Sequence, residues 1–292
     1  MNFMGYVRPD GRVGSRNLVG ILPSVTCAND VAQAIVTEVQ GTVGFFHHQG
    51  CCQLPPDLDR VTETLTSLGC SPNLAAVLIV SLGCEGTDYE KMYSAIEATG
   101  KPVRMIGIQE LGGVSNAIQK GIDLARELVL QVSGHQREPV DISRAVMAIK
   151  CGASDTTSGM ASNCVIGYVA DKLVDLGAKV VFGETTEFLG GEHLLARRAV
   201  NEQVAQKIYD IVNAMEARAK SLGCDMRKGQ PTPGNIAGGL SSIEEKSLGA
   251  IVKSGTKPIQ GVLEYPEMIT TQKGLWIKDT PGREPEILTG MA

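Results

Sequence analysis

Short apolar runs alternate with amphipathic stretches through the first half of the chain. The clearest run, 75–82 (AAVLIVSL), has the uninterrupted apolar character of a strand buried on both faces. Similar runs predict further strands at 18–23, 42–48 and 103–109. Apolar residues at helical spacing predict helices at 29–38, 57–68, 89–98 and 114–132. This alternation predicts a doubly wound, mainly parallel sheet.

The same alternation restarts after a short polar segment, 133–141, which is the linker candidate. Strands are predicted at 144–150 and 179–183, and helices at 163–176, 193–220 and 241–253, the last with a capping-box start at Ser241. After Gly255 the pattern is weak and predicts loops.

We therefore predict an α/β protein of two Rossmann-like, three-layer units with mainly parallel sheets. Residues 1–138 form an α/β domain that dimerises and contributes part of the site. Residues 139–292 form a Rossmann-like catalytic domain, whose sheet is expected to be truncated at the C-terminus.

Composition narrows the class of protein. Aromatic residues make up only 4% of the chain and glycines number 34, which suits an α/β sheet with tight turns. The net charge of −5 lacks the excess of positive charge that is typical of proteins that bind nucleic acid or an anionic membrane. No apolar run reaches the roughly 20 residues needed to cross a bilayer. The N-terminus lacks the apolar core of a signal peptide, so we expect a cytoplasmic protein.

Three predicted strands end in a turn that places a cysteine beside a glycine or a second cysteine. These cysteines are Cys51, Cys84 and Cys151. Ligands bind outside the carboxyl ends of parallel strands, and three thiols with His48 nearby can hold a metal such as iron. The alternative is packing, because free cysteine often acts as a small buried hydrophobe. We assign packing to Cys27, Cys70, Cys164 and Cys224 and leave Cys52 open.

A second group of candidates follows the predicted strand 179–183. Carboxylates at a strand end can ligate a metal or remove a proton from carbon beside a carboxylate. Glu184 is therefore a further ligand candidate, and Glu187 and His193 are candidate bases. The alternative is that Glu187 and Glu192 flank a helix start and interact with its dipole.

Two segments can recognise an anionic substrate. In KCGASDTTSG, Ser154 and Thr156 offer hydroxyl groups, Lys150 offers a countercharge or a base, and Asp155 is a further catalytic candidate. Neither GxGxxG nor GxxxxGK[ST] occurs, which disfavours a nucleotide. An ordinary capped helix start is the alternative.

The second segment is RPDGRVGSRN near the N-terminus. Its Arg12 and Arg16 can clamp a substrate carboxylate in bidentate fashion. A solvated arm or a subunit contact explains the same arginines equally well.

Six motifs together resemble the altronate/galactarate dehydratase family, which also includes the large subunit of sulfolactate sulfo-lyase. The similarity extends from about Phe3 to Gly255, and the motifs occur in this order: GYVRPDGRVGSRNLVGILPSVTCAND, HHQGCCQ, LGCEG, KCGASDTTSGMASNCVIG, GETTEFLGGEHLLARRA and SSIEEKSLGAIVKSG. The resemblance implies a reductant-dependent elimination that requires iron, as Fe²⁺ or an iron–sulfur cluster. It also implies a small β-rich SAF-type domain or partner subunit, and family members that extend beyond Ala292.

We therefore expect a homodimeric hydro-lyase that converts an altronate-like or galactarate-like acid into a 2-keto-3-deoxy acid by metal-assisted removal of the α proton. The nearest alternative is the large subunit of a sulfolactate sulfo-lyase, which cleaves a C–S bond by the same logic. A non-catalytic scaffold with structural cysteines is the alternative outside enzymes. The absence of a CxxC pair disfavours a thiol-redox protein.

Overall fold

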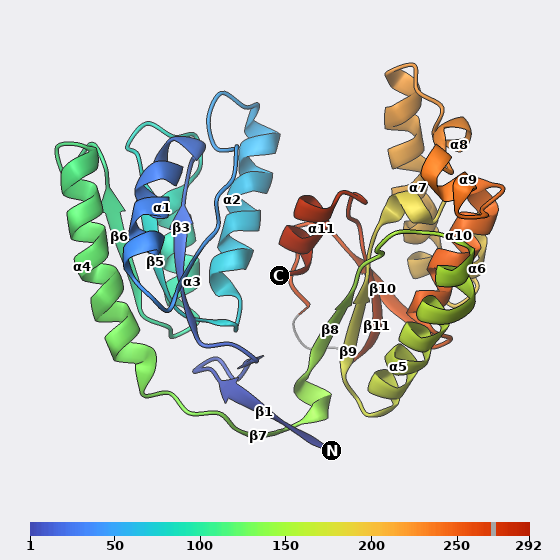
Figure 1. Ribbon diagram of the computed structural model, residues 1–292, viewed down its shortest axis with the longest axis horizontal. Coiled ribbons are helices and arrows are strands. Elements are labelled where there is room, and N and C mark those ends of the chain that lie inside the picture. The colour runs from blue at the N-terminus through green and yellow to red at the C-terminus, as the bar shows by residue number, and fades with distance from the viewer. Residues whose placement is uncertain (270–272) are drawn as a thin grey trace. The chain divides into compact units, whose positions relative to one another are not determined.

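The structure is a computed structural model that describes residues 1–269 and 273–292. The chain divides into two compact units, formed in the main by Asn2–Val140 and Asp141–Met291. Each unit contains a parallel sheet flanked by helices, labelled in Figure 1. The predicted fold class is therefore confirmed. Within the described residues, no helix combines the length and apolar character needed to cross a membrane.

The first unit is built on a parallel sheet in the order β4-β3-β5-β6 (Figure 1). Its strands are β3 (Leu18–Pro23), β4 (Thr42–Gly44), β5 (Leu74–Ser81) and β6 (Val103–Gly107). Every residue of β5 is buried, as its uninterrupted apolar run predicts. One face packs against α1 (Asn29–Glu38) and α4 (Val114–Ser133), and the other against α2 (Pro55–Cys70) and α3 (Tyr89–Glu97).

A small second sheet in this unit was not predicted. It has the order β2-β1-β7 and consists of β1 (Asn2–Val7), β2 (Val13–Gly14) and β7 (Glu138–Asp141). Strand β7 lies inside the segment expected to be a linker. The buried Arg8 holds the region together, because its guanidinium donates to the carbonyls of Pro72 and Arg16, both at 2.7 Å.

Lys101 is a buried cation of the first unit, with 5% of its surface exposed. Its Nζ donates to the carbonyls of Gly69 at 2.9 Å and Ser71 at 2.8 Å. Burial penalises the charged form and lowers the pKa of Lys101 to about 8, from an ordinary value of 10.5.

We expect this lysine to make the protein more stable as the pH rises from about 8 to 10.5. In that window the unfolded chain still binds a proton that the folded lysine has lost, so the free energy of unfolding increases with pH. Below pH 8 both states carry the proton and the dependence vanishes. Urea unfolding across the window should show this rise in the wild type and in the exposed-site control Lys120→Met. An equal rise in Lys101→Met would contradict the assignment.

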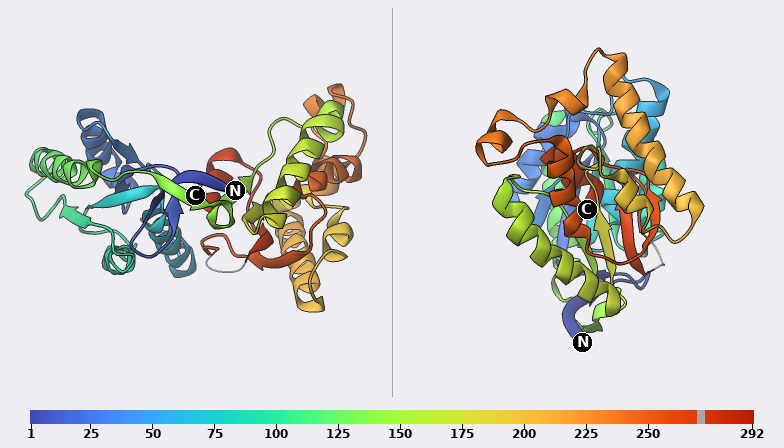
Figure 2. Two further views of the ribbon diagram at one scale, coloured as in Figure 1. Left: turned by 90° about the horizontal axis from the view of Figure 1, so that it is seen from below. Right: turned by 90° about the vertical axis from the view of Figure 1, so that its right-hand side faces the viewer.

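The second unit contains a parallel sheet in the order β10-β11-β9-β8. Its strands are β8 (Val146–Ile149), β9 (Lys179–Phe182), β10 (Ile259–Leu263) and β11 (Gly274–Lys278). Helices α5 (Asn163–Asp175) and α7 (Glu202–Ser221) cover the face seen in the right panel of Figure 2, and share one core with α10 (Ile243–Ile251). The shorter helices are α6 (Glu192–Ala196), α8 (Met226–Gly229), α9 (Pro233–Ala237) and α11 (Glu284–Met291).

The expected single helix over 193–220 is wrong. After α6 the backbone pairs with the edge of the sheet, where the Val200 N–H donates to the carbonyl of Ile259 at 3.1 Å. Asn201 then caps a new helix by accepting a hydrogen bond from the Val204 N–H. A contact distant in sequence thus interrupts a helical pattern that looks continuous.

The expectation of loops after Gly255 is also wrong for much of that segment. It supplies β10, β11 and α11, and so contributes two strands to the second sheet. The part of the expectation that falls on residues 270–272 lies outside the described residues. The cap of α10 is displaced by one residue, because Ser242 rather than Ser241 accepts from the Glu245 N–H.

Candidate functional site

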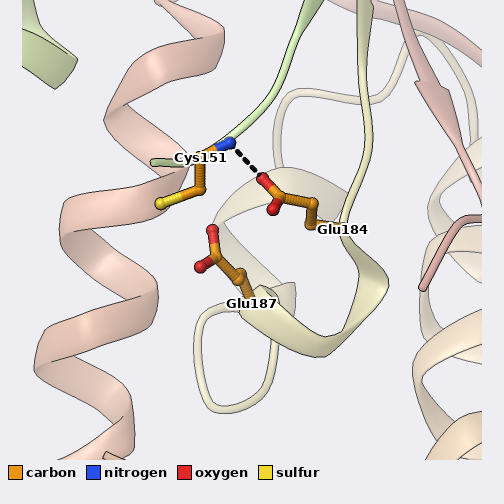
Figure 3. Close-up of side chains that lie close together, drawn as sticks. All are labelled: Cys151, Glu184 and Glu187. Carbon is orange, nitrogen blue, oxygen red and sulfur yellow. Dashed lines mark hydrogen bonds between the residues drawn. The ribbon is translucent and has the colours of Figure 1, made fainter. Parts of the chain in front are cut away.

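The carboxyl ends of the neighbouring strands β8 and β9 bring Cys151, Glu184 and Glu187 together (Figure 3). The Cys151 Sγ and one oxygen of each carboxylate all lie within 4.8 Å of one another. The Cys151 N–H donates to Glu184 Oε2 at 2.6 Å. Glu187 reaches the group from a single 3₁₀ turn, η4 (Thr185–Glu187), that follows β9. Two strand-end loops therefore build one cluster.

Lys253 completes this cluster and was not predicted. It lies in η5 (Val252–Ser254), is fully buried, and places Nζ 3.2 Å from Glu184 Oε2 and 3.0 Å from Glu187 Oε2. Its Nζ also lies 5.7 Å from the centroid of the Phe182 ring, a cation–π contact. The sequence does contain a signal for this residue, because Lys253 lies in the otherwise apolar stretch GAIVKSG. Apolar neighbours indicate burial, and a buried lysine requires charged partners.

The charges of the cluster influence one another strongly. Burial raises the pKa of Glu184, and the nearby charge of Glu187 raises it further against the opposing effect of Lys253. Burial alone would lower the pKa of Lys253, but Glu187 and Glu184 outweigh it and the pKa is raised. Burial and Glu187 also raise the pKa of the Cys151 thiol. The lysine therefore stays cationic, and proton uptake by Glu184 is favoured relative to an exposed glutamate.

The backbone at Glu184 is held in an unusual conformation. Its φ of 70° lies in the left-handed region, which costs a residue with a side chain of order 1 kcal/mol or more. Two hydrogen bonds to Thr280 fix it: the Glu184 N–H donates to Oγ1 at 2.8 Å, and the Thr185 N–H donates to the carbonyl at 3.0 Å. Strain of this kind concentrates at functional sites.

The donor set fits a divalent cation. One thiol and two carboxylates suit a borderline transition metal such as Fe²⁺, once the thiol has lost its proton. Lys253 Nζ already contacts one oxygen of each carboxylate, so a bound metal ion would either share these oxygens with the lysine or displace it from them.

The other predicted residues of the second unit lie around this cluster or away from it. Ser154 Oγ is 3.2 Å from Cys151 Sγ, and Lys150 forms an exposed ion pair with Glu284 at 2.8 Å. His193 is exposed on α6, outside the cluster.

Two residues of the KCGASDTTSG loop serve the loop itself. Asp155 accepts hydrogen bonds from Thr157 Oγ1 at 2.8 Å and the Ser158 N–H at 2.7 Å, which lowers its pKa. Thr156 Oγ1 donates to the carbonyl of Gly238 at 3.1 Å. These contacts favour a structural role over the predicted catalytic role of Asp155 and the predicted substrate-binding role of Thr156.

The remaining predicted ligands belong to the first unit. Cys51 and Cys84 are exposed, as is His48, whose Nε2 contacts Gln49 Nε2 at 2.8 Å. Cys70 is buried, as expected of a packing residue. Packing in the core is wrong for the other cysteines to which it was assigned, because they are exposed: Cys27, Cys164 and Cys224.

The arginine segment is largely engaged within the first unit. Arg12 pairs with Asp10 at 2.7 Å and donates to the carbonyl of Cys70 at 2.7 Å, whereas Arg16 is exposed. The contacts of Arg12 favour the structural alternative over a carboxylate clamp.

Comparison with known proteins identifies the family. Residues 5–133 match the second domain of D-galactarate dehydratase/altronate hydrolase, and residues 142–292 match the C-terminal domain of D-galactarate/altronate dehydratase. The chain belongs to the galactarate/altronate dehydratase family. The resemblance drawn from the motifs is therefore confirmed.

Several relatives from this family are lyases by name. The chain is 42% identical over 291 residues to (2R)-sulfolactate sulfo-lyase subunit beta of Chromohalobacter salexigens, covering 98% of this chain and 73% of that protein. It is 32% identical to the altronate dehydratase of Bacillus subtilis, covering 97% and 58%. It is also 32% identical to the L-threo-forming galactarate dehydratase of Escherichia coli, covering 97% and 57%. The chain thus spans little more than half the length of these dehydratases.

Proposed function

We propose that this chain is the catalytic part of a lyase that eliminates a leaving group β to the carboxylate of an anionic 2-hydroxy acid. The observation that carries the proposal is the buried Glu184–Lys253–Glu187 group beside Cys151. Elimination next to a carboxylate needs a base for the α proton, a fixed positive charge and a proton donor, and this group contains all three. The lyase names of the relatives support the same class.

Glu187 is the proposed base. Its side chain is 11% exposed, against 2% for Glu184, so it is the more accessible carboxylate of the two. Removal of the α proton leaves a pair of electrons that is first delocalised into the carboxylate. This pair then forms the C=C bond as the β leaving group departs with its own bonding pair. The resulting enol then becomes a 2-keto acid. Lys150 and His193 remain the alternative bases.

Lys253 and Glu184 support this step. The Lys253 ammonium, held between two carboxylates, lies ready to offset negative charge that develops on the substrate carboxylate. The raised pKa of Glu184 suits it to deliver a proton to the departing group. A divalent ion such as iron, if held by Cys151, Glu184 and Glu187, would supply Lewis-acid stabilisation of the same charge, and Lys150 or His193 would then be the base.

Water and sulfite are the two candidate leaving groups. Dehydration of a sugar acid is the chemistry named for the relatives from Bacillus subtilis and Escherichia coli. Cleavage of a C–S bond is favoured by the 42% identity to the sulfo-lyase subunit, which is matched over 73% of its length. That relative is itself a subunit, so we also propose a partner subunit for this chain.

The first half-reaction tests the proposal. The chain, supplied with Fe²⁺ and a reductant in D₂O, is expected to exchange the α proton of (2R)-sulfolactate, altronate or galactarate, as followed by NMR. Exchange does not require the leaving group to depart. Sulfite or a 2-keto-3-deoxy acid among the products then identifies the leaving group. Absence of exchange with all three acids would refute α-proton abstraction by the chain on its own.

A further inference from the structure

Two neighbouring cysteines in the loop after β4 bring their thiols into contact. Cys51 Sγ lies 3.5 Å from Cys52 Sγ, and both residues are exposed. At this distance the two sulfur atoms form a hydrogen bond, in which one S–H donates to the other sulfur. Because both side chains face solvent, packing in a core does not account for the pair.

The backbone turns sharply to place both thiols on one side of the chain. In an extended segment successive side chains point in opposite directions, so adjacent cysteines would normally lie apart. Cys52 instead adopts a left-handed φ of 55°, which brings its thiol next to that of Cys51. This conformation is strained for a residue with a side chain, and strain of this kind concentrates at functional sites. The contact between the thiols is therefore a specific property of this turn.

Hydrogen bonds hold the loop on both sides of the pair. The Gly50 N–H donates to Gln53 Oε1 at 2.8 Å, and Gln53 Nε2 donates to Gln49 Oε1 at 2.5 Å. The Gly50 carbonyl accepts from the Gly86 N–H at 2.9 Å, which ties the loop to the segment after β5. Position 50 requires glycine, because its φ is 100° and a Cβ would lie 2.7 Å from the carbonyl oxygen of Ser24. The two thiols are therefore presented from a turn whose backbone is fixed.

The geometry suits a disulfide bond that forms and breaks readily. Bond formation would draw the sulfur atoms from 3.5 Å to about 2.05 Å. Neighbouring Cα atoms are about 3.8 Å apart across a trans peptide, whereas ordinary disulfides join Cα atoms roughly 4.4–6.8 Å apart. A bond between Cys51 and Cys52 would therefore be strained, and strained, exposed disulfides are easily reduced. The pair consequently fits a reversible modification rather than a permanent cross-link.

We propose that Cys51 and Cys52 are a redox modification site, which a low-molecular-weight disulfide such as glutathione disulfide oxidises to a vicinal disulfide. One cysteine thiolate attacks a sulfur of glutathione disulfide, forms a mixed disulfide and releases a glutathione thiolate. The second cysteine thiolate then attacks the cysteine sulfur of the mixed disulfide and displaces the other glutathione. The electrons and protons that the protein loses are taken up by the two glutathione thiols. The proposal goes beyond the proposed function, which rests on residues of the second unit.

The test uses the full chain, first reduced and then held in glutathione disulfide at mildly alkaline pH, because the contact with Cys52 raises the pKa of the Cys51 thiol. Free thiols are then alkylated, and chymotrypsin cleaves after Phe46 and Leu58 to release a fragment whose cysteines are Cys51 and Cys52. We expect mass spectrometry to find most of this fragment without alkyl groups and lighter by two hydrogen atoms. Excess reduced glutathione, added before alkylation, should return it to the dialkylated form.

Matched variants make the outcome decisive. Cys51→Ser and Cys52→Ser should each leave the remaining thiol as a mixed disulfide with glutathione, because the adjacent thiol that would displace the glutathione is absent. Cys27→Ser and Cys84→Ser remove exposed thiols of other loops in the first unit and should form the vicinal bond as the wild type does. A wild-type fragment that stays dialkylated, a cross-link to a third cysteine, or a disulfide that excess reduced glutathione does not break overturns the proposal. Circular dichroism confirms that each variant is folded.

Discussion

Lys253→Met is expected to lower the free energy of unfolding by about 3–5 kcal/mol, because removing one partner of a buried ion pair leaves charge without compensation. Lys253 is fully buried and lies between Glu184 and Glu187, whose side chains are 2% and 11% exposed. Methionine fills a similar volume, so the loss reflects charge rather than a cavity. Urea unfolding of the intact chain measures it.

Two companion variants test the electrostatic cause. Lys207→Met breaks an exposed pair with Glu264 at 3.5 Å and should cost about 0–1 kcal/mol. Adding Glu184→Gln and Glu187→Gln to Lys253→Met should restore much of the lost stability, since no charge is then buried alone. If Lys253→Met costs no more than Lys207→Met, the cluster does not depend on its lysine.

Glu187→Gln is expected to slow exchange of the substrate α proton by roughly 10²–10⁴-fold, the usual contribution of a general base. Glutamine keeps the shape and can still contact Lys253, but it cannot accept the proton. The fold should be little affected, because loss of the Glu187 charge removes one effect that raises the pKa of Glu184, which is then free to neutralise the lysine. The measurement is the rate of deuterium incorporation at saturating substrate, beside the unfolding midpoint.

The matched control is Glu202→Gln, which changes an exposed glutamate in the first turn of α7. It should exchange at the wild-type rate. Exchange by Glu187→Gln at that same rate would exclude Glu187 as the base and direct attention to Lys150 or His193.

The sequence predicted the first unit well because its strands are long apolar runs. Strand β3 has the predicted bounds, and β5 differs by one residue at each end. Strand β2 was missed because it is only two residues long, and β11 was missed because it begins at a glycine in a segment without a clear apolar period. Their pairing comes from partners distant in the chain, which a local pattern does not contain.

In the candidate site, too, the features contained in the local sequence were predicted, and a contact between distant segments was not. Placement at strand ends could be read from the sequence, because parallel strands present their carboxyl ends at one edge. Cys151, Glu184 and Glu187 were singled out on that basis. Lys253 was not, because it enters from η5, 66 residues after Glu187 in sequence. Its apolar neighbours indicate that it is buried, but not which carboxylates it meets.

The left-handed backbone at Glu184 bears differently on the stability of the turn after β9 and on its proposed chemistry. Glycine at position 184 would relieve the backbone strain and also the excess negative charge, since one lysine would then face one carboxylate. Mutants chosen only for resistance to heat would therefore tend to give up this glutamate. At this position the demands of heat resistance and of the proposed chemistry therefore point to different residues.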